Sequence, residues 1–237
     1  MKFIECNATN FRRGRNGTAI KYIVVHYTAN NGDTAEGNLR YFSSATNLKA
    51  SAHYFVDEKE VAQSVSDTDT AWHCGGGLQG GGGATHYQKC DNSNSIGIEL
   101  CSRKNAAGNY YFMDKTLENA IEFIKTLMNK YGIDRAHVIR HYDVTGKNCP
   151  APLIAGNSWS AFLNRLNVPI APPKEEEEDG MIYNWIDENM PKWAIPTVEK
   201  LYNKGIIKGN EKGELGLNDT MLRMLVIHDR VGLYDKV

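Results

Sequence analysis

The stretch that decides the fold is IKYIVVHY, residues 20–27, a nearly continuous run of apolar and β-branched side chains. Such a run is typical of a strand that is covered on both faces, because neither face carries regularly spaced polar residues. The segments around it alternate between strand and helix patterns. The sequence therefore predicts an α/β fold with one central mixed β-sheet flanked by helices, plus a small, mostly α-helical C-terminal domain.

Other elements follow on both sides of this strand. Further strands are expected at 51–56, 95–100 and 137–141. Asp33, with Glu36 three residues later, resembles a capping box and predicts a helix there. Asp114 is expected to cap a second helix that ends at Gly132, and Ser158 to open a third.

The clearest break in the chain is VPIAPPKEEEEDG, residues 168–180. Its prolines stiffen the backbone and its four consecutive glutamates are strongly solvated. The break predicts a linker between a domain at 1–167 and a second domain at 181–237. The second domain is too short to bury a large core by itself.

Charge and hydropathy exclude some classes of function. The 237 residues carry 27 basic and 28 acidic side chains, a net charge of −1, which argues against a broad face for nucleic acid. No run approaches the roughly 18 apolar residues of a membrane span, so no membrane insertion is expected. The first residues lack the apolar core of a signal peptide, which predicts synthesis in the cytoplasm and another exit for any role outside the cell.

Two histidines and one cysteine are candidate metal ligands. His26 ends the most apolar strand, where an imidazole needs a partner, and His141 ends another expected strand eight residues before Cys149. Two imidazoles and a thiolate are good zinc ligands and leave a fourth position for water. Lys147 precedes Cys149 by two residues, so in a locally extended loop both side chains point the same way. Hydrogen-bonded core histidines and a buried thiol are the alternative interpretation.

A carboxylate stands out in the segment SIGIEL, residues 95–100. Gly97 and Glu99 share one strand face, and three apolar side chains occupy the other. A carboxylate among apolar neighbours costs free energy unless it is paired or used, although an exposed residue of an edge strand would have the same pattern. A metal, a base for water and a cation for a developing oxyanion together make a hydrolase.

The order of five motifs adds a resemblance. They are VVHYTA (24–29), SAHYFVD (51–57), AWHCGG (71–76), NSIGIEL (94–100) and RHYDVTGKNCP (140–150). In this order they resemble the type 2 N-acetylmuramoyl-L-alanine amidases, a family that includes peptidoglycan recognition proteins and phage endolysins. The resemblance implies a Zn²⁺ site of His26, His141 and Cys149. It also implies hydrolysis of the amide between the lactyl group of N-acetylmuramic acid and L-alanine in cell-wall peptidoglycan.

The resemblance also assigns catalytic and binding roles. It places Glu99 and Lys147 at the catalytic glutamate and lysine of one branch, which implies direct hydrolysis with Glu99 moving the proton and Lys147 stabilising the oxyanion. Another branch has a catalytic tyrosine where this chain has Ala52, so that role is absent here. Trp72 and His73 match a motif that lines the glycan–peptide groove; for Trp72 an aromatic that anchors a loop is the alternative.

The C-terminal segment from Pro191 through Tyr234 resembles a single degenerate S-layer-homology unit. Its first helix is expected to start near Pro196 with Val198, Leu201 and Tyr202 buried, and its second to cover 219–231. The resemblance implies binding to a wall polymer, with self-association as a homodimer through 181–237 as a competing role.

Together these features favour a phage endolysin that lyses a Gram-positive host. The alternatives are a non-catalytic peptidoglycan-binding module, a bacterial autolysin and a cytosolic recycling amidase. Cys149 and the C-terminal segment argue against the binding module and the recycling enzyme, respectively.

Overall fold

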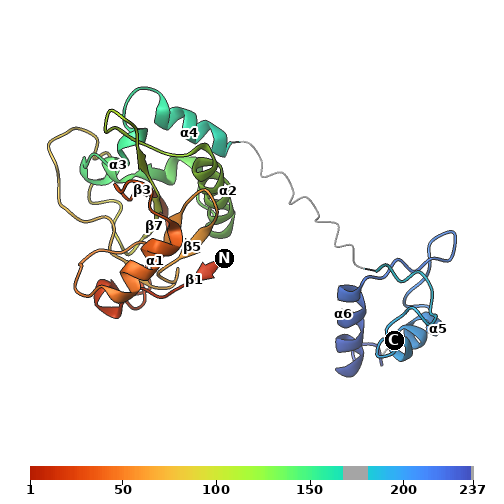
Figure 1. Ribbon diagram of the computed structural model, residues 1–237. Coiled ribbons are helices and arrows are strands. Elements are labelled where there is room, and N and C mark those ends of the chain that lie inside the picture. Colours follow the sequence, from red (N-terminus) through yellow and green to blue (C-terminus); the bar gives the residue numbers. More distant parts are fainter. Residues whose placement is uncertain (168–180, 236–237) are drawn as a thin grey trace. The chain divides into compact units, whose positions relative to one another are not determined.

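The computed structural model describes residues 1–167 and 181–235, so the linker predicted at 168–180 lies outside the described residues. The described residues form two compact units, one in each of these two ranges (Figure 1). No helix among them has the length and apolar character that a membrane span needs.

The N-terminal unit is built on a six-stranded mixed sheet, which confirms the predicted fold class. The strands lie in the order β1 (Lys2–Phe3), β5 (Val61–Gln63), β4 (Tyr54–Val56), β7 (Ser95–Leu100), β3 (Tyr22–Tyr27) and β10 (Val138–Arg140). All neighbouring strands run parallel except the β4–β5 pair. The apolar run that decides the fold is thus an inner strand with a parallel partner on each side.

Helices cover both faces of the sheet. They are α1 (Ala35–Ser44), α2 (Asp114–Tyr131), α3 (His141–Thr145) and α4 (Ser158–Leu166). Three single-turn 3₁₀ helices are η1 (Ala8–Asn10), η2 (Arg135–His137) and η3 (Ala151–Leu153). Two short antiparallel pairs lie outside the main sheet: β2 (Phe11–Arg12) with β6 (Thr70–Ala71), and β8 (Arg103–Lys104) with β9 (Tyr110–Tyr111).

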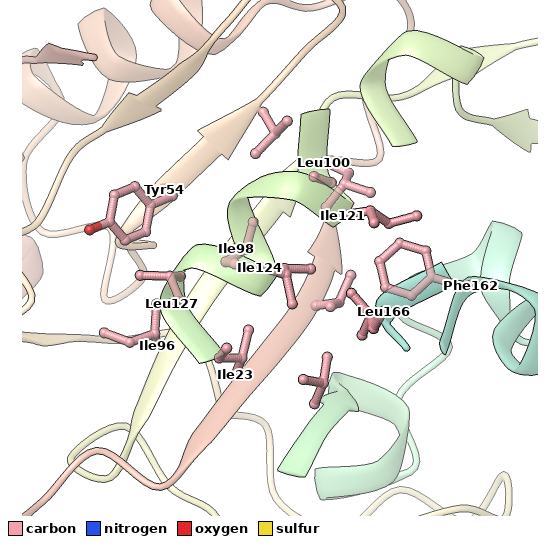
Figure 2. Close-up of a cluster of buried hydrophobic side chains, with 14 of the residues drawn as sticks. Ile23, Tyr54, Ile96, Ile98, Leu100, Ile121, Ile124, Leu127, Phe162 and Leu166 are labelled. Atoms are coloured by element: carbon pink, nitrogen blue, oxygen red, sulfur yellow. The ribbon is translucent and has the colours of Figure 1, made fainter. Parts of the chain in front are cut away.

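The main core lies between the sheet and helices α2 and α4 (Figure 2). Its buried side chains include Ile23 and Val25 of β3, Ile96, Ile98 and Leu100 of β7, Ile121, Ile124 and Leu127 of α2, and Phe162 and Leu166 of α4. Each such side chain contributes roughly 1.5–3 kcal/mol when fully buried. Because side chains alternate along a strand, this packing turns His26 and Glu99 toward the opposite face.

The opposite face carries α1 and α3. Ala35 and Leu39 of α1 pack on Phe55 of β4, while Val144 of α3 packs on Val24 of β3. The candidate site residues therefore lie on the face of the sheet that α1 and α3 cover, opposite the main core.

Several predicted boundaries are wrong. β3 begins at Tyr22 rather than residue 20, and β4 begins at Tyr54 rather than residue 51, because Ser51 bonds to Trp72 outside the sheet. The strand predicted at 137–141 is only Val138–Arg140, and His141 begins α3 instead of ending a strand. The carboxylate of Asp143 accepts hydrogen bonds from Arg140 and thereby starts that helix.

The predicted helix caps also differ from those observed. Thr34, not Asp33, caps α1, with its Oγ1 accepting a bond from the Gly37 N–H at 3.0 Å. Asp114 lies in the first turn of α2, and the preceding cap residue, Met113, makes no side-chain cap bond. α2 ends at Gly132 as predicted, where φ is +64° and glycine is favoured.

The C-terminal unit contains α5 (Ile195–Asn203) and α6 (Asp219–Arg230), near the predicted positions. Its core is small and consists of Met190, Ala194, Val198, Leu222 and Val226, with Leu201 also fully buried. The prediction that Tyr202 is buried is wrong, since the residue is 49% exposed. Leu201 already occupies the inner face of the helix, and its neighbour along the chain is rotated away from it.

Candidate active site

Three neighbouring parallel strands bring the candidate residues to one edge of the sheet. His26 and Glu99 are the penultimate residues of β3 and β7 and lie directly opposite each other in the register. His141 follows the last residue of β10, the strand on the other side of β3. Cys149 returns to this edge after α3 and a turn at Gly146, where φ is +79°. The carboxyl ends of parallel strands are where α/β sheets usually place their ligands.

The two histidines and the cysteine form a compact cluster. Their ligand atoms all lie within 4.8 Å of one another, and each residue is at most 4% exposed. Cys149 Sγ lies 3.6 Å from His26 Nδ1. Bond lengths of about 2.0 Å to nitrogen and 2.3 Å to sulfur in a tetrahedral zinc site require almost this separation.

Neighbouring groups orient both imidazoles. His141 Nε2 donates to the carbonyl oxygen of Gly75 at 3.0 Å, which leaves its Nδ1 buried without a partner among the described residues. His26 Nε2 lies 3.0 Å from His73 Nδ1, and His73 Nε2 lies 3.3 Å from the Ser95 hydroxyl. If each ring donates outward along this chain, the Nδ1 lone pairs of His26 and His141 both face the cluster. Such outer hydrogen bonds hold metal ligands in the required tautomer.

The electrostatics also fit a bound cation. Burial lowers the pKa of His26 well below 6.5, and burial with the charge of Lys147 lowers the pKa of His141 to about 4. Both rings are therefore neutral, which is the form that binds metal. Burial and the charge of Glu99 raise the pKa of Cys149 to about 12, so its thiolate needs a positive partner. These residues fit a metal site.

Glu99 and Lys147 flank this cluster. Both line a cavity of about 290 Å³ that also exposes the three candidate ligands, Trp72 and His73. Burial raises the pKa of Glu99 to about 8, although the charge of Lys147 opposes the shift. One carboxylate oxygen, Oε2, is buried without a hydrogen-bond partner. A buried polar atom without a partner is costly, so an unpaired carboxylate here indicates a functional group.

The two residues predicted to line a binding groove differ in position. Trp72 is partly exposed and lines the cavity, and its backbone pairs with Ser51. His73 is 7% exposed, and its ring nitrogens lie within hydrogen-bonding distance of His26 Nε2, Cys74 Sγ and Ser95 Oγ. Neither position tests whether substrate touches these residues, and both assignments remain predictions.

The sequence reasoning missed the support that this site receives from Gly97 and Gly75. A Cβ at Gly97 would lie 2.5 Å from the His73 ring, so only glycine leaves room for that imidazole over β7. A glycine inside a strand is a signal of such a close approach. The role of Gly75 could not be predicted from the sequence, because it depends on a backbone carbonyl group, which every residue has.

Comparison with known families gives one match within each of the two units. Residues 16–152 match the family described as N-acetylmuramoyl-L-alanine amidase, and residues 186–224 match the S-layer homology domain. The chain belongs to the N-acetylmuramoyl-L-alanine amidase family. All five sequence motifs and the metal-ligand cluster lie within the amidase match.

Individual amidases support the assignment. The chain is 34% identical over 168 residues to the N-acetylmuramoyl-L-alanine amidase BlyA of Bacillus subtilis, covering 68% of this chain and 44% of that protein. It is 32% identical over 177 residues to a probable N-acetylmuramoyl-L-alanine amidase of Bacillus licheniformis, covering 70% and 46%. The chain thus spans about half the length of the curated relatives it matches.

Solved structures have the same fold. A mutant endolysin from Bacillus subtilis superposes with a TM-score of 0.55 at 32% identity, covering 70% of this chain and 97% of that one. The structure of PlyL superposes with a TM-score of 0.56 at 26% identity, covering 70% and 96%.

Proposed function

We propose that this chain is a zinc-dependent N-acetylmuramoyl-L-alanine amidase that hydrolyses the amide between N-acetylmuramic acid and L-alanine in peptidoglycan. The observation that carries the proposal is the cluster of His26, His141 and Cys149 beside an unpaired, buried Glu99 oxygen. The family match and the endolysin from Bacillus subtilis among the structural relatives support it and favour a wall-lytic enzyme of the endolysin type.

The metal chemistry follows from the ligand set. His26 Nδ1, His141 Nδ1 and Cys149 Sγ would hold the ion. A zinc ion with three protein ligands supplies a Lewis acid for a carbonyl oxygen and lowers the pKa of water towards about 7. His73 and the Gly75 carbonyl keep the two imidazoles oriented, so the ligands are already arranged before the ion binds.

The proposed catalytic groups are Glu99 and Lys147. The Glu99 carboxylate accepts a proton from the attacking water and then delivers it to the departing nitrogen of L-alanine. A carboxyl with a pKa near the working pH is suited to both transfers, and its pKa of about 8 meets that condition. The Lys147 ammonium, which lines the same cavity, stabilises the carbonyl oxygen as it gains negative charge.

For the C-terminal unit we propose binding to a polymer of the cell wall. The match of residues 186–224 to the S-layer homology domain supports this role. Self-association through the same unit is the competing role, because α6 exposes an apolar stripe of Met221 (47%), Met224 (53%) and Ile227 (58%) beside a small core. Sedimentation of the full chain, with and without Met224→Lys, separates a dimer from a monomer that binds walls.

End-group analysis of digested Gram-positive sacculi tests the proposed reaction. We expect free amino termini of L-alanine to increase without new reducing sugars. New reducing ends would instead identify a glycosidase and refute the proposal. Sacculi that are bound but not cleaved by zinc-loaded protein would identify a non-catalytic binding module.

A further inference from the structure

A second, larger cavity adjoins the candidate active site. It measures about 590 Å³ and shares Thr28, Phe42 and Glu99 with the smaller cavity that exposes the metal-ligand cluster. Its remaining lining residues are Asn30, Asp33, Gly37, Asn38, Tyr41 and Phe55. A substrate group next to the reacting amide can therefore extend directly from one cavity into the other.

Asp33 gives this cavity a fixed negative charge. Its carboxylate accepts hydrogen bonds from Thr28 Oγ1 at 3.1 Å, Asn30 Nδ2 at 3.2 Å and Asn38 Nδ2 at 2.6 Å. Asn38 is itself 7% exposed and is held in place by the Thr34 carbonyl oxygen. The carboxylate is thus oriented before a ligand arrives, which lowers the entropy cost of binding.

No positive charge in the cavity balances Asp33. None of the lining residues is Lys, Arg or His, and the three donors to Asp33 are a hydroxyl and two neutral amides. Arg103, the guanidinium next to Gly32, is already paired with Glu58. The Asp33 carboxylate therefore faces a cavity with no cationic side chain in its lining, which favours a positively charged group and disfavours an anion.

The aromatic residues strengthen this preference. Tyr41 and Phe42 line the same cavity as Asp33, and an aromatic face attracts a cation that has lost part of its water. A primary ammonium on a flexible stem suits such a site, because it offers three donors and a short apolar chain.

We propose that the cavity is an ammonium-binding subsite and that Asp33 determines specificity for substrates with a free primary amine. This inference rests on the proposed function. Peptidoglycan presents primary ammonium groups in two places, on the diamino acid of the stem peptide and on glucosamine that lacks its N-acetyl group. Both place the same chemistry near the scissile amide.

The test compares matched substrates with the zinc-loaded full chain. One pair is a muramyl tripeptide that ends in L-lysine and the same tripeptide with the lysine Nε acetylated. The second pair is a disaccharide tripeptide with glucosamine or N-acetylglucosamine beside the muramic acid, with Nε acetylated in both. We expect kcat/KM to be about tenfold higher for the free amine in one pair, which identifies its source; equal kcat/KM within both pairs overturns the proposal.

Two variants separate Asp33 from general effects. Asp33→Asn should reduce the ratio of kcat/KM between the free-amine and acetylated substrates to about one. Glu36→Gln, which alters a surface carboxylate paired with Lys2 and Arg40, should keep the full preference. A preference that survives Asp33→Asn in a folded protein also overturns the proposal. A test without any variant uses salt: the preference of the unmodified chain for the free amine should weaken as the salt concentration rises.

Failure of the proposed function has a different signature. In that case no substrate is hydrolysed, and equilibrium binding of the two lysine tripeptides to the full chain decides the matter. Tighter binding of the free amine that Asp33→Asn removes supports the subsite, and equal binding overturns it.

Discussion

Replacing Glu99 by Gln tests the catalytic site through stability as well as activity. The substitution keeps the shape of the side chain but removes its charge. In the folded protein burial raises the pKa of Glu99 from 4.5 to about 8, with Lys147 opposing and Asp33 adding to the shift. The folded state therefore prefers the protonated, neutral carboxyl when no metal is bound.

The sign and size of the stability effect follow from this shift. Because the pKa of Glu99 is raised in the folded state, its favourable contribution to the free energy of unfolding is complete below about pH 4.5. This contribution is lost as the pH rises through about 8. A pKa difference of about 3.5 corresponds to about 5 kcal/mol. Because Glu99 keeps partial exposure, solvent screening reduces this to about 2–3 kcal/mol. Glutamine carries no charge, so a glutamine at position 99 does not lower the stability at high pH.

Denaturant unfolding of chelator-treated protein at pH 4 and pH 9 measures the effect. Between pH 4 and pH 9 the free energy of unfolding of Glu99→Gln should rise by about 2–3 kcal/mol relative to that of the unmodified protein. With zinc restored, the variant should retain the metal and lose turnover by about 10²–10⁴-fold. Glu118→Gln is the matched control, since that carboxylate is 48% exposed and should change neither quantity.

Two results would refute the reasoning. A stability difference that does not depend on pH would show that the carboxyl is not held in its neutral form by burial. Turnover close to that of the unmodified protein, with metal retained, would remove Glu99 from the role of general base.

Three further predictions concern the metal-ligand cluster and its surroundings. Gly97→Ala should lower the free energy of unfolding by about 1–3 kcal/mol and weaken zinc binding about tenfold, because its Cβ would lie 2.5 Å from the His73 ring. Denaturant unfolding and competition with a chelator measure the two effects. Gly80→Ala, which has open space around it, should change neither quantity. Chelation should destabilise the protein by about 2.7 kcal/mol relative to zinc at 100 times its Kd, and thermal melting of His141→Ala should show no such shift. Cys74 packs against the buried cluster that contains Cys90, so oxidised glutathione should link the two thiols with a loss of about 2 Da in intact mass. An unchanged mass, or a bond to another cysteine in peptide maps, would contradict this.

Much of the fold could be predicted because its strongest signals are local. The β-branched run at 22–27 and the apolar stripe of α2 specify their elements through side-chain periodicity alone. The errors arose where two local signals competed. Asp33 and Thr34 are both good cap residues, and only the neighbouring Thr28 and Asn38 draw the Asp33 carboxylate away from the helix.

The start of α3 illustrates the same limit. Val138 and Ile139 predict a strand through His141, but Asp143 binds Arg140 and turns the chain into a helix at that histidine. This turn directs the buried Nδ1 of His141 toward the cluster, while its Nε2 bonds to the carbonyl oxygen of Gly75. An extended backbone would direct the ring elsewhere, so the sequence predicted that His141 joins the cluster but not the local geometry that brings it there.

The sequence by itself determined the chemical types at the site: two histidines and a carboxylate near the ends of apolar segments, and a cysteine in a loop that follows one of them. Tertiary structure alone decided how they are supported and what lies beside them. The contact of His73 with His26, the clearance over Gly97 and the cavity around Asp33 all join segments far apart in the chain. They depend on the register of β3 against β7 and on the loops packed over that edge, because side-chain periodicity specifies the face of a strand but not its neighbours.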